Sequence, residues 1–180
     1  MAHSSRDGTH AANAGDHHAA KNTKERENAR MGEGHYVRLA VMALLSFVFM
    51  YVLMYAMVDV IGNVYSNYNQ FYMAGLMAAP MVVLELLLMG AMYPNRRLNA
   101  LFLAASGLAA VVFFTFIRGQ TAISDRQFLR SMISHHASAL LMCERASIHD
   151  PEVVELCGVI LLSQQEQIDE MKAKLQELGG

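Results

Sequence analysis

The chain has 180 residues, a formal net charge of −2 and 54% apolar side chains. This near-neutral balance, without a concentrated basic surface, argues against a nucleic-acid binder. The only two cysteines, Cys143 and Cys157, form no CxxC pair. They are too few for a disulfide scaffold and do not have the spacing of a structural zinc site.

Polarity divides the chain into three blocks: residues 1–35 are polar, 36–117 are strongly apolar, and 118–180 are mixed and charged. The first block is too long for a cleavable signal peptide, and its composition is typical of a disordered tail. Its adjacent histidines could bind metal weakly, but a solvated tail is the simpler interpretation. The histidines of this block are His3, His10, His17, His18 and His35.

The apolar block predicts three transmembrane helices, at about residues 39–58, 71–92 and 98–117. Each segment has about the 20 residues that a helix needs to cross a bilayer. Only the second contains a charged residue, Glu85, and a proline, Pro80.

The charges beside these segments predict how they are oriented. Arg96 and Arg97 lie in the short connection between the second and third segments, and further Lys and Arg residues precede the first. The connection at 61–70 has neither residue type, and its tyrosines resemble an interfacial aromatic belt. The positive-inside rule therefore predicts an integral protein of a bacterial inner membrane. Its N-terminus would be cytoplasmic and residues 118–180 periplasmic.

A carboxylate inside a span is costly, so Glu85 has two interpretations. It could serve a metal or proton path, or it could be a protonated or hydrogen-bonded packing residue. Methionines recur every four residues beside it, but this spacing winds around a helix instead of holding one face. With no second charge in the spans as its partner, the packing role is favoured. The methionines are Met73, Met77, Met81 and Met89.

The last block predicts two helices in an antiparallel hairpin. Ser124 and Gln127 have the spacing of a capping box for a first helix that ends near Ser147. Asp150 is expected to cap the second helix, with Pro151 at its first position, and this helix runs to about residue 178.

In such a hairpin, facing residues have numbers that sum to roughly 298 to 300. Cys143 then faces Cys157, and the adjacent His135 and His136 lie level with Ser163 and Gln164. On the same register Met132 approaches Ile168. A lone hairpin buries little core, so we expect it to dimerise into a four-helix bundle or to pack against neighbouring protein at the membrane surface.

The first hairpin helix places imidazole, thioether and thiol groups on neighbouring turns, through His135, His136, Met132, Met142 and Cys143. This mixture suits a soft or borderline metal such as copper, with Cu(I) favoured by the sulfur ligands. Because adjacent residues differ by about 100° around a helix, only one histidine can point squarely into the seam. Alternatively, the histidines are surface or interface residues and the methionines fill the core.

The two cysteines have three possible states: a disulfide, which would persist outside the cytoplasm, thiolate ligands of the metal, or buried free thiols. Packed helix axes lie roughly 8–10 Å apart, whereas a disulfide needs Cα atoms within about 7 Å. A disulfide therefore requires a close approach, which Gly158 or the nearby turn could permit.

Three sequence features together resemble the signature of the DUF305 family over about residues 125–175. They are the pattern FLxxMIxHHxxAxxM from Phe128 to Met142, the segment Asp150-Pro151-Glu152-Val153, and the pattern QQEQIxxM from Gln164 to Met171. Members of this family are small helical proteins of ferritin-like architecture, and some bind copper outside the cytoplasm.

The resemblance implies a helical bundle in which Met and His side chains hold copper. Carried over by position, the candidate ligands are Met132, His135, His136, Met142 and Met171. This chain departs from the pattern in having a single paired-histidine motif, so that a full four-helix unit needs a partner. It also has Cys143 where a small residue such as alanine is expected.

Taken together, the sequence predicts an all-α protein: three transmembrane helices followed by an extracytoplasmic antiparallel hairpin that forms half of a ferritin-like bundle. We expect it to bind, buffer or deliver copper, with the lipid bilayer, a metal ion and a second copy as partners. The alternative is a membrane interaction or oligomerisation module with structural or pH-sensing histidines. No enzyme is expected, because the motifs of di-iron bundles, zinc proteases, serine hydrolases and nucleotide-binding loops are missing.

Overall fold

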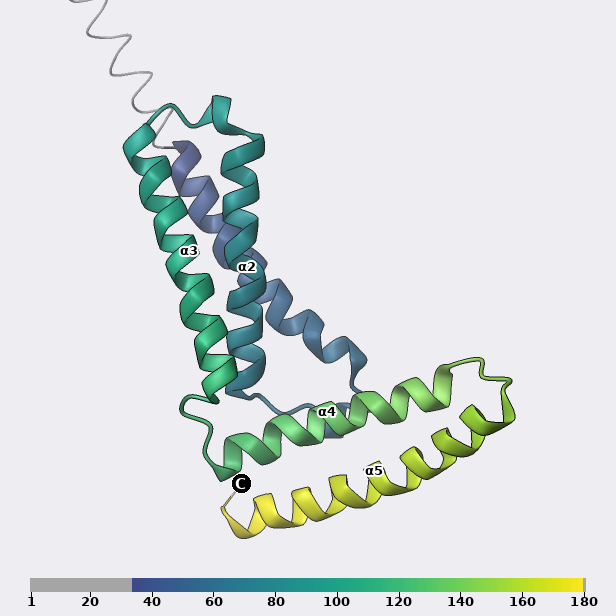
Figure 1. Ribbon diagram of the computed structural model, residues 1–180. Helices are drawn as coiled ribbons and strands as arrows, with labels where there is room; N and C mark the ends of the chain where they lie inside the picture. Colours follow the sequence, from purple (N-terminus) through teal and green to yellow (C-terminus); the bar gives the residue numbers. More distant parts are fainter. Residues whose placement is uncertain (1–33, 180) are drawn as a thin grey trace, which may run out of the picture.

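The computed structural model describes residues 34–179, and every regular element in this range is a helix (Figure 1). Three apolar helices precede a helical C-terminal region, which confirms the predicted fold class. The tail predicted for residues 1–35 falls outside the described residues, except for Gly34 and His35.

Three helices are long and apolar enough to cross a membrane: Gly34–Met57, α2 (Tyr68–Leu88) and α3 (Arg96–Gly119). Short 3-10 turns accompany them: η1 (Met54–Met57) ends the first helix, η2 (Ile61–Asn63) lies in the following loop, and η3 (Gly90–Met92) follows α2.

Asparagine caps explain why α2 and α3 begin slightly earlier than the apolar stretches alone indicate. Asn67 accepts a hydrogen bond from the Gln70 backbone N–H, and α2 therefore starts at Tyr68. Asn95 accepts from the N–H groups of Arg97 and Leu98 and starts α3 in the same way. Such caps satisfy backbone donors that the first helical turn leaves without a partner.

Helices α2 and α3 pack side by side along their length, whereas the first helix leans away from them toward its C-terminal end (Figure 1). The first helix is anchored at its start, where Tyr36 and Leu39 join a buried cluster with Val82, Leu86 and Tyr93. The Tyr93 hydroxyl donates to Glu85 Oε1 at 3.3 Å. Glu85 is therefore hydrogen-bonded within the packed end of the bundle, as the packing interpretation expects.

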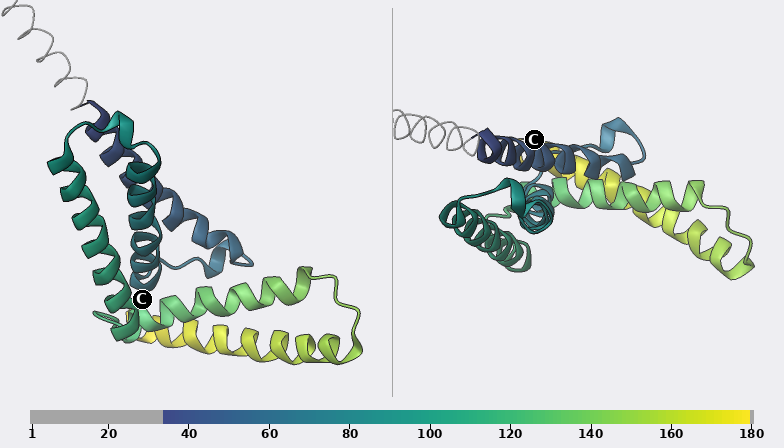
Figure 2. Two further views of the ribbon diagram at one scale, coloured as in Figure 1. Left: turned by 45° about the horizontal axis from the view of Figure 1, so that its top comes forward. Right: turned by 90° about the horizontal axis from the view of Figure 1, so that it is seen from above.

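The hairpin consists of α4 (Asp125–Arg145) and α5 (Pro151–Glu177) and lies crosswise below the ends of α2 and α3 (Figures 1 and 2). Asp150 caps α5 by accepting from the Glu152 and Val153 N–H groups, with Pro151 at the first position, as predicted. The core of the hairpin is made by buried side chains from both helices, namely Ile133, Ala137, Leu140, Ile168 and Leu175.

Helix α4 is the part of the hairpin that rests on the first interhelical loop. The Ser134 hydroxyl donates to the Asn63 carbonyl oxygen at 3.0 Å, and this hydrogen bond is buried. Val58 and Tyr65 from the same loop pack against the hairpin core. The predicted capping box is wrong: Ser124 precedes α4 but makes no capping hydrogen bond. Gln127 Oε1 instead accepts from the Tyr68 N–H at 3.0 Å, because α4 lies against the start of α2.

Gly75 allows the closest approach between α2 and α3. A Cβ atom at this position would overlap the ring of Phe113, whereas a Cβ at Gly107 on α3 would meet open space. We expect Gly75→Val to destabilise the protein by about 1–3 kcal/mol through overpacking, and Gly107→Val to have little effect. Thermal unfolding of the two detergent-purified variants would test this, and equal stabilities would contradict the packing of Gly75 against Phe113.

Candidate metal-binding site on the hairpin

The two adjacent histidines lie near the middle of α4, with their ring centroids 6.1 Å apart. His135 is exposed, whereas His136 is half-buried. Their difference follows from the step of about 100° between successive helical residues. As expected, only one of the two can point toward α5, and it is His136.

His136 connects the two helices of the hairpin. Its Nδ1 lies 2.8 Å from the Met132 carbonyl oxygen, and its Nε2 lies 2.9 Å from Gln167 Oε1 on α5. If the ring is neutral and donates from Nδ1, its Nε2 is an acceptor, and the Gln167 amide must be flipped so that its NH2 group donates to Nε2. If the ring is protonated, both nitrogens donate, one to each oxygen. Both ring nitrogens therefore already have a partner.

The partner of His136 lies one turn beyond the predicted position. The antiparallel register placed Ser163 and Gln164 level with the histidines, yet the bond is made by Gln167. Helical side chains lean toward the N-terminus of their helix, and on α4 this direction leads away from the turn of the hairpin. His136 consequently reaches a residue farther along α5. Allowing for this lean of the side chain would have corrected the predicted partner.

The methionines divide between the seam and the surface. Met171 is half-buried and packs against the hairpin core, and Met132 is also half-buried. Met142 is 53% exposed on α4. The predicted ligands therefore form two groups, with His136 and Met171 at the seam and His135 and Met142 on the outside. Met132 belongs to the turn that precedes the histidines.

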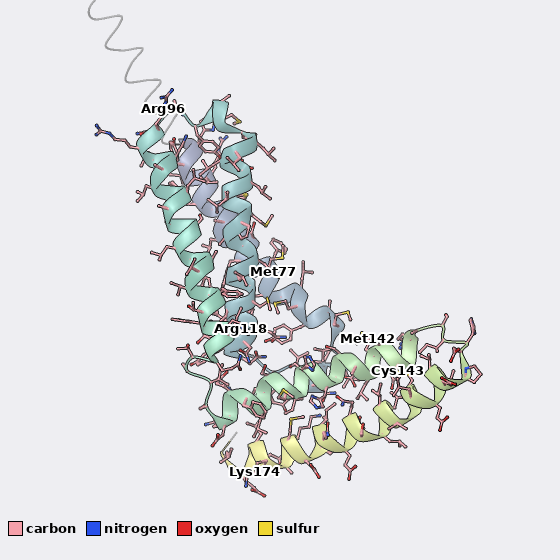
Figure 3. The ribbon with its side chains drawn as sticks, in the orientation of Figure 1. Met77, Arg96, Arg118, Met142, Cys143 and Lys174 are labelled. Atoms are coloured by element: carbon pink, nitrogen blue, oxygen red, sulfur yellow. A yellow bond between two sulfur atoms is a disulfide. The ribbon has the colours of Figure 1, made fainter. Side chains whose placement is uncertain are left out.

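Cys143 and Cys157 form a disulfide between α4 and α5, with their Cα atoms 5.4 Å apart (Figure 3). This confirms that the two cysteines face each other. Of their three possible states the structure has the disulfide, so they are neither thiolate ligands nor free thiols. A Cβ atom at position 158 would meet open space. The close approach therefore does not depend on Gly158. The two cysteines flank the short connection between the helices, which runs from residue 146 to residue 150.

Among residues 34–179, no three His, Cys, Asp or Glu side chains gather as a metal-binding group. Carboxylates and thiolates therefore do not supplement the histidines in the described part of one chain. The thioether of Met132 lies three residues from His135, one turn along α4, and that of Met142 lies seven residues away, two turns along it. Residues at these spacings share one side of a helix.

The sequence profile of the family described as "domain of unknown function (DUF305)" matches residues 89–180, from the end of α2 through the hairpin. The chain is also similar to an uncharacterised protein of Acanthamoeba polyphaga mimivirus. The two are 33% identical over 119 residues, which cover 65% of this chain and 76% of the viral protein. No solved structure matches the chain.

Removing the disulfide tests its role in holding the hairpin closed. We expect the double variant Cys143→Ala, Cys157→Ala to lose about 3 kcal/mol of unfolding free energy, because a closed loop of about 15 residues restricts the unfolded chain by that amount. Chemical unfolding of the full-length protein in detergent would measure this loss. As a control, a thiol-reactive maleimide should label the wild-type protein only after reduction, and labelling before reduction would contradict the disulfide.

Proposed function

We propose that this chain, which belongs to the DUF305 family, is a membrane-anchored protein that binds copper outside the cytoplasm. Its three apolar helices would anchor it in the bilayer, and the α4–α5 hairpin would present the metal site. The role would be binding, buffering or delivery of the ion.

The observation that carries the proposal is the exposed imidazole of His135, one helical turn from the thioether of Met132. Imidazole and thioether ligands favour Cu(I) over hard cations such as Mg²⁺ and Ca²⁺, which prefer oxygen. Among the described residues the His135 side chain makes no hydrogen bond, unlike that of His136. We therefore assign His135 as the principal ligand, with Met132 as its thioether partner. Met142 lies ten residues from Met132, about 15 Å along α4, and is too far away to share an ion with it in one chain.

His136 and Met171 would support the site from the seam. To bind metal through Nε2, His136 must release Gln167, and to bind through Nδ1 it must release the Met132 carbonyl. Its two hydrogen bonds instead hold the α4 turn that carries both Met132 and His135. His136 is thus a positioning residue whose loss should weaken binding less than loss of His135.

Two observations support a periplasmic location for the hairpin. A disulfide such as Cys143–Cys157 persists in oxidising compartments and is rare in the cytoplasm. Arg96 and Arg97 lie at the end of the spans opposite the hairpin, where the positive-inside rule expects the cytoplasm (Figure 3). Arg118 lies at the hairpin end and opposes this orientation, but it is a single residue.

A second function, an interaction module without metal, is favoured by one observation. His136 satisfies both ring nitrogens within the hairpin, as a structural histidine does. In that case copper would not change the thermal stability of the protein, because a ligand stabilises only a folded state that binds it.

Copper titration of the full-length protein in detergent separates these functions. With ascorbate as the reductant, which leaves the disulfide intact, we expect stoichiometric Cu(I) uptake. His135→Ala should weaken it at least tenfold and His136→Ala by a smaller factor. His149→Ala is the matched control, because His149 is exposed in the turn outside the proposed site. Equal affinities of the wild type and His135→Ala would reject the proposed site.

A further inference from the structure

Helix α4 carries a second stripe that faces neither α5 nor the loop beneath the spans. Its members alternate at spacings of three and four residues, which is the a/d pattern of a coiled-coil seam. They are Phe128, Met132, His135, Ala139 and Met142. Phe128 is 50% exposed and Met142 is 53% exposed, so the stripe is uncovered at both ends.

This stripe is separate from the face that forms the hairpin core. At about 100° per residue, its centre lies roughly 150° around α4 from the centre of the buried residues Ile133, Ala137 and Leu140. A solvated helix of a monomer ordinarily carries polar residues on the face opposite its core. The apolar residues on this stripe therefore indicate a missing partner helix.

The spacing along the stripe is symmetric about His135. Phe128 precedes it by seven residues and Met142 follows it by seven. If two copies of α4 lie antiparallel and centred on His135, each Phe128 meets a Met142. A two-fold interface requires this kind of self-complementarity.

The position of α4 relative to the spans fits the same symmetry. Two copies anchored in one membrane keep the same face outward, so that a two-fold axis relating them must run along the bilayer normal. Helix α4 lies crosswise to α2 and α3 (Figures 1 and 2). Rotation by 180° about that axis therefore leaves the second α4 at the same depth and reverses its direction. Membrane anchoring thus favours the antiparallel arrangement that the spacing indicates.

We infer that the α4 stripe is an interface with a second copy of this chain, which brings the two His135 side chains together at the two-fold axis. The inference deepens the proposed function and rests on it for the identity of the ligand. The pair would place two imidazoles between two Met132 thioethers, with each copy supplying one imidazole and one thioether. One copper ion per two chains is the expected stoichiometry.

Cysteine cross-linking tests the interface without metal. Both native cysteines of the chain are already paired, so a new cysteine is the only free thiol. His135→Cys in metal-free native membranes should give a disulfide-linked dimer under mild oxidation. Glu144→Cys is the matched control, because Glu144 is exposed on the same helix and lies nine residues away, about 180° around it. It should remain monomeric.

A second pair of variants tests the direction of the helices. Phe128→Cys chains mixed with Met142→Cys chains should cross-link to each other. Phe128→Cys alone should not, because two copies of position 128 would lie about 21 Å apart along the antiparallel pair. Cross-linking of Phe128→Cys to itself would overturn the antiparallel register even if all variants fold.

Cross-linking and copper stoichiometry together distinguish the inference from the proposed function. Cross-linking at position 135 with one copper per two wild-type chains supports both. Cross-linking at 135 without copper uptake by the wild type supports the interface and rejects the metal function. The interface is rejected if position 135 does not cross-link, or if position 144 cross-links equally well. If copper then binds at one ion per chain, the metal function is retained.

Discussion

The buried hydrogen bond from the Ser134 hydroxyl to the Asn63 carbonyl ties the hairpin to the three apolar helices. A buried backbone carbonyl without a partner costs about 1–3 kcal/mol, so this contact holds one face of α4 against the loop between the first helix and α2. Helix α5 covers a second face of α4. The stripe that contains His135 is the face that remains, and both proposals depend on its being uncovered.

Much of the fold could be predicted from the sequence because its causes are local. Long apolar segments specify the three membrane-capable helices, and the Asp150-Pro151 pair specifies where α5 begins. The facing of Cys143 and Cys157 follows from a short turn and helical geometry. The failures involve tertiary contacts. Gln127 lies in the right place to cap α4, but the start of α2 supplies a competing donor that no local pattern reveals.

The candidate site was predictable in composition but not in arrangement. Spacing correctly separates His135 from His136, since adjacent helical residues cannot share a direction. It does not reveal which of them faces α5, nor that Gln167 forms a hydrogen bond with the one that does, His136. Likewise, the sequence leaves the cysteines open between metal ligation and a disulfide. The distance between the two backbones decides that question, and the tertiary structure sets it: the two Cα atoms lie 5.4 Å apart.

The disulfide lies at the far end of the hairpin, close to its turn, whereas the other end of α4 continues into α3. Every peptide bond between Cys143 and Cys157 is therefore enclosed in a covalent ring. A protease that nicks the exposed turn at His149 opens the ring but does not detach α5. The severed helix stays tethered through Cys143 to α4 and so to the three apolar helices, and a reductant is then required to free it.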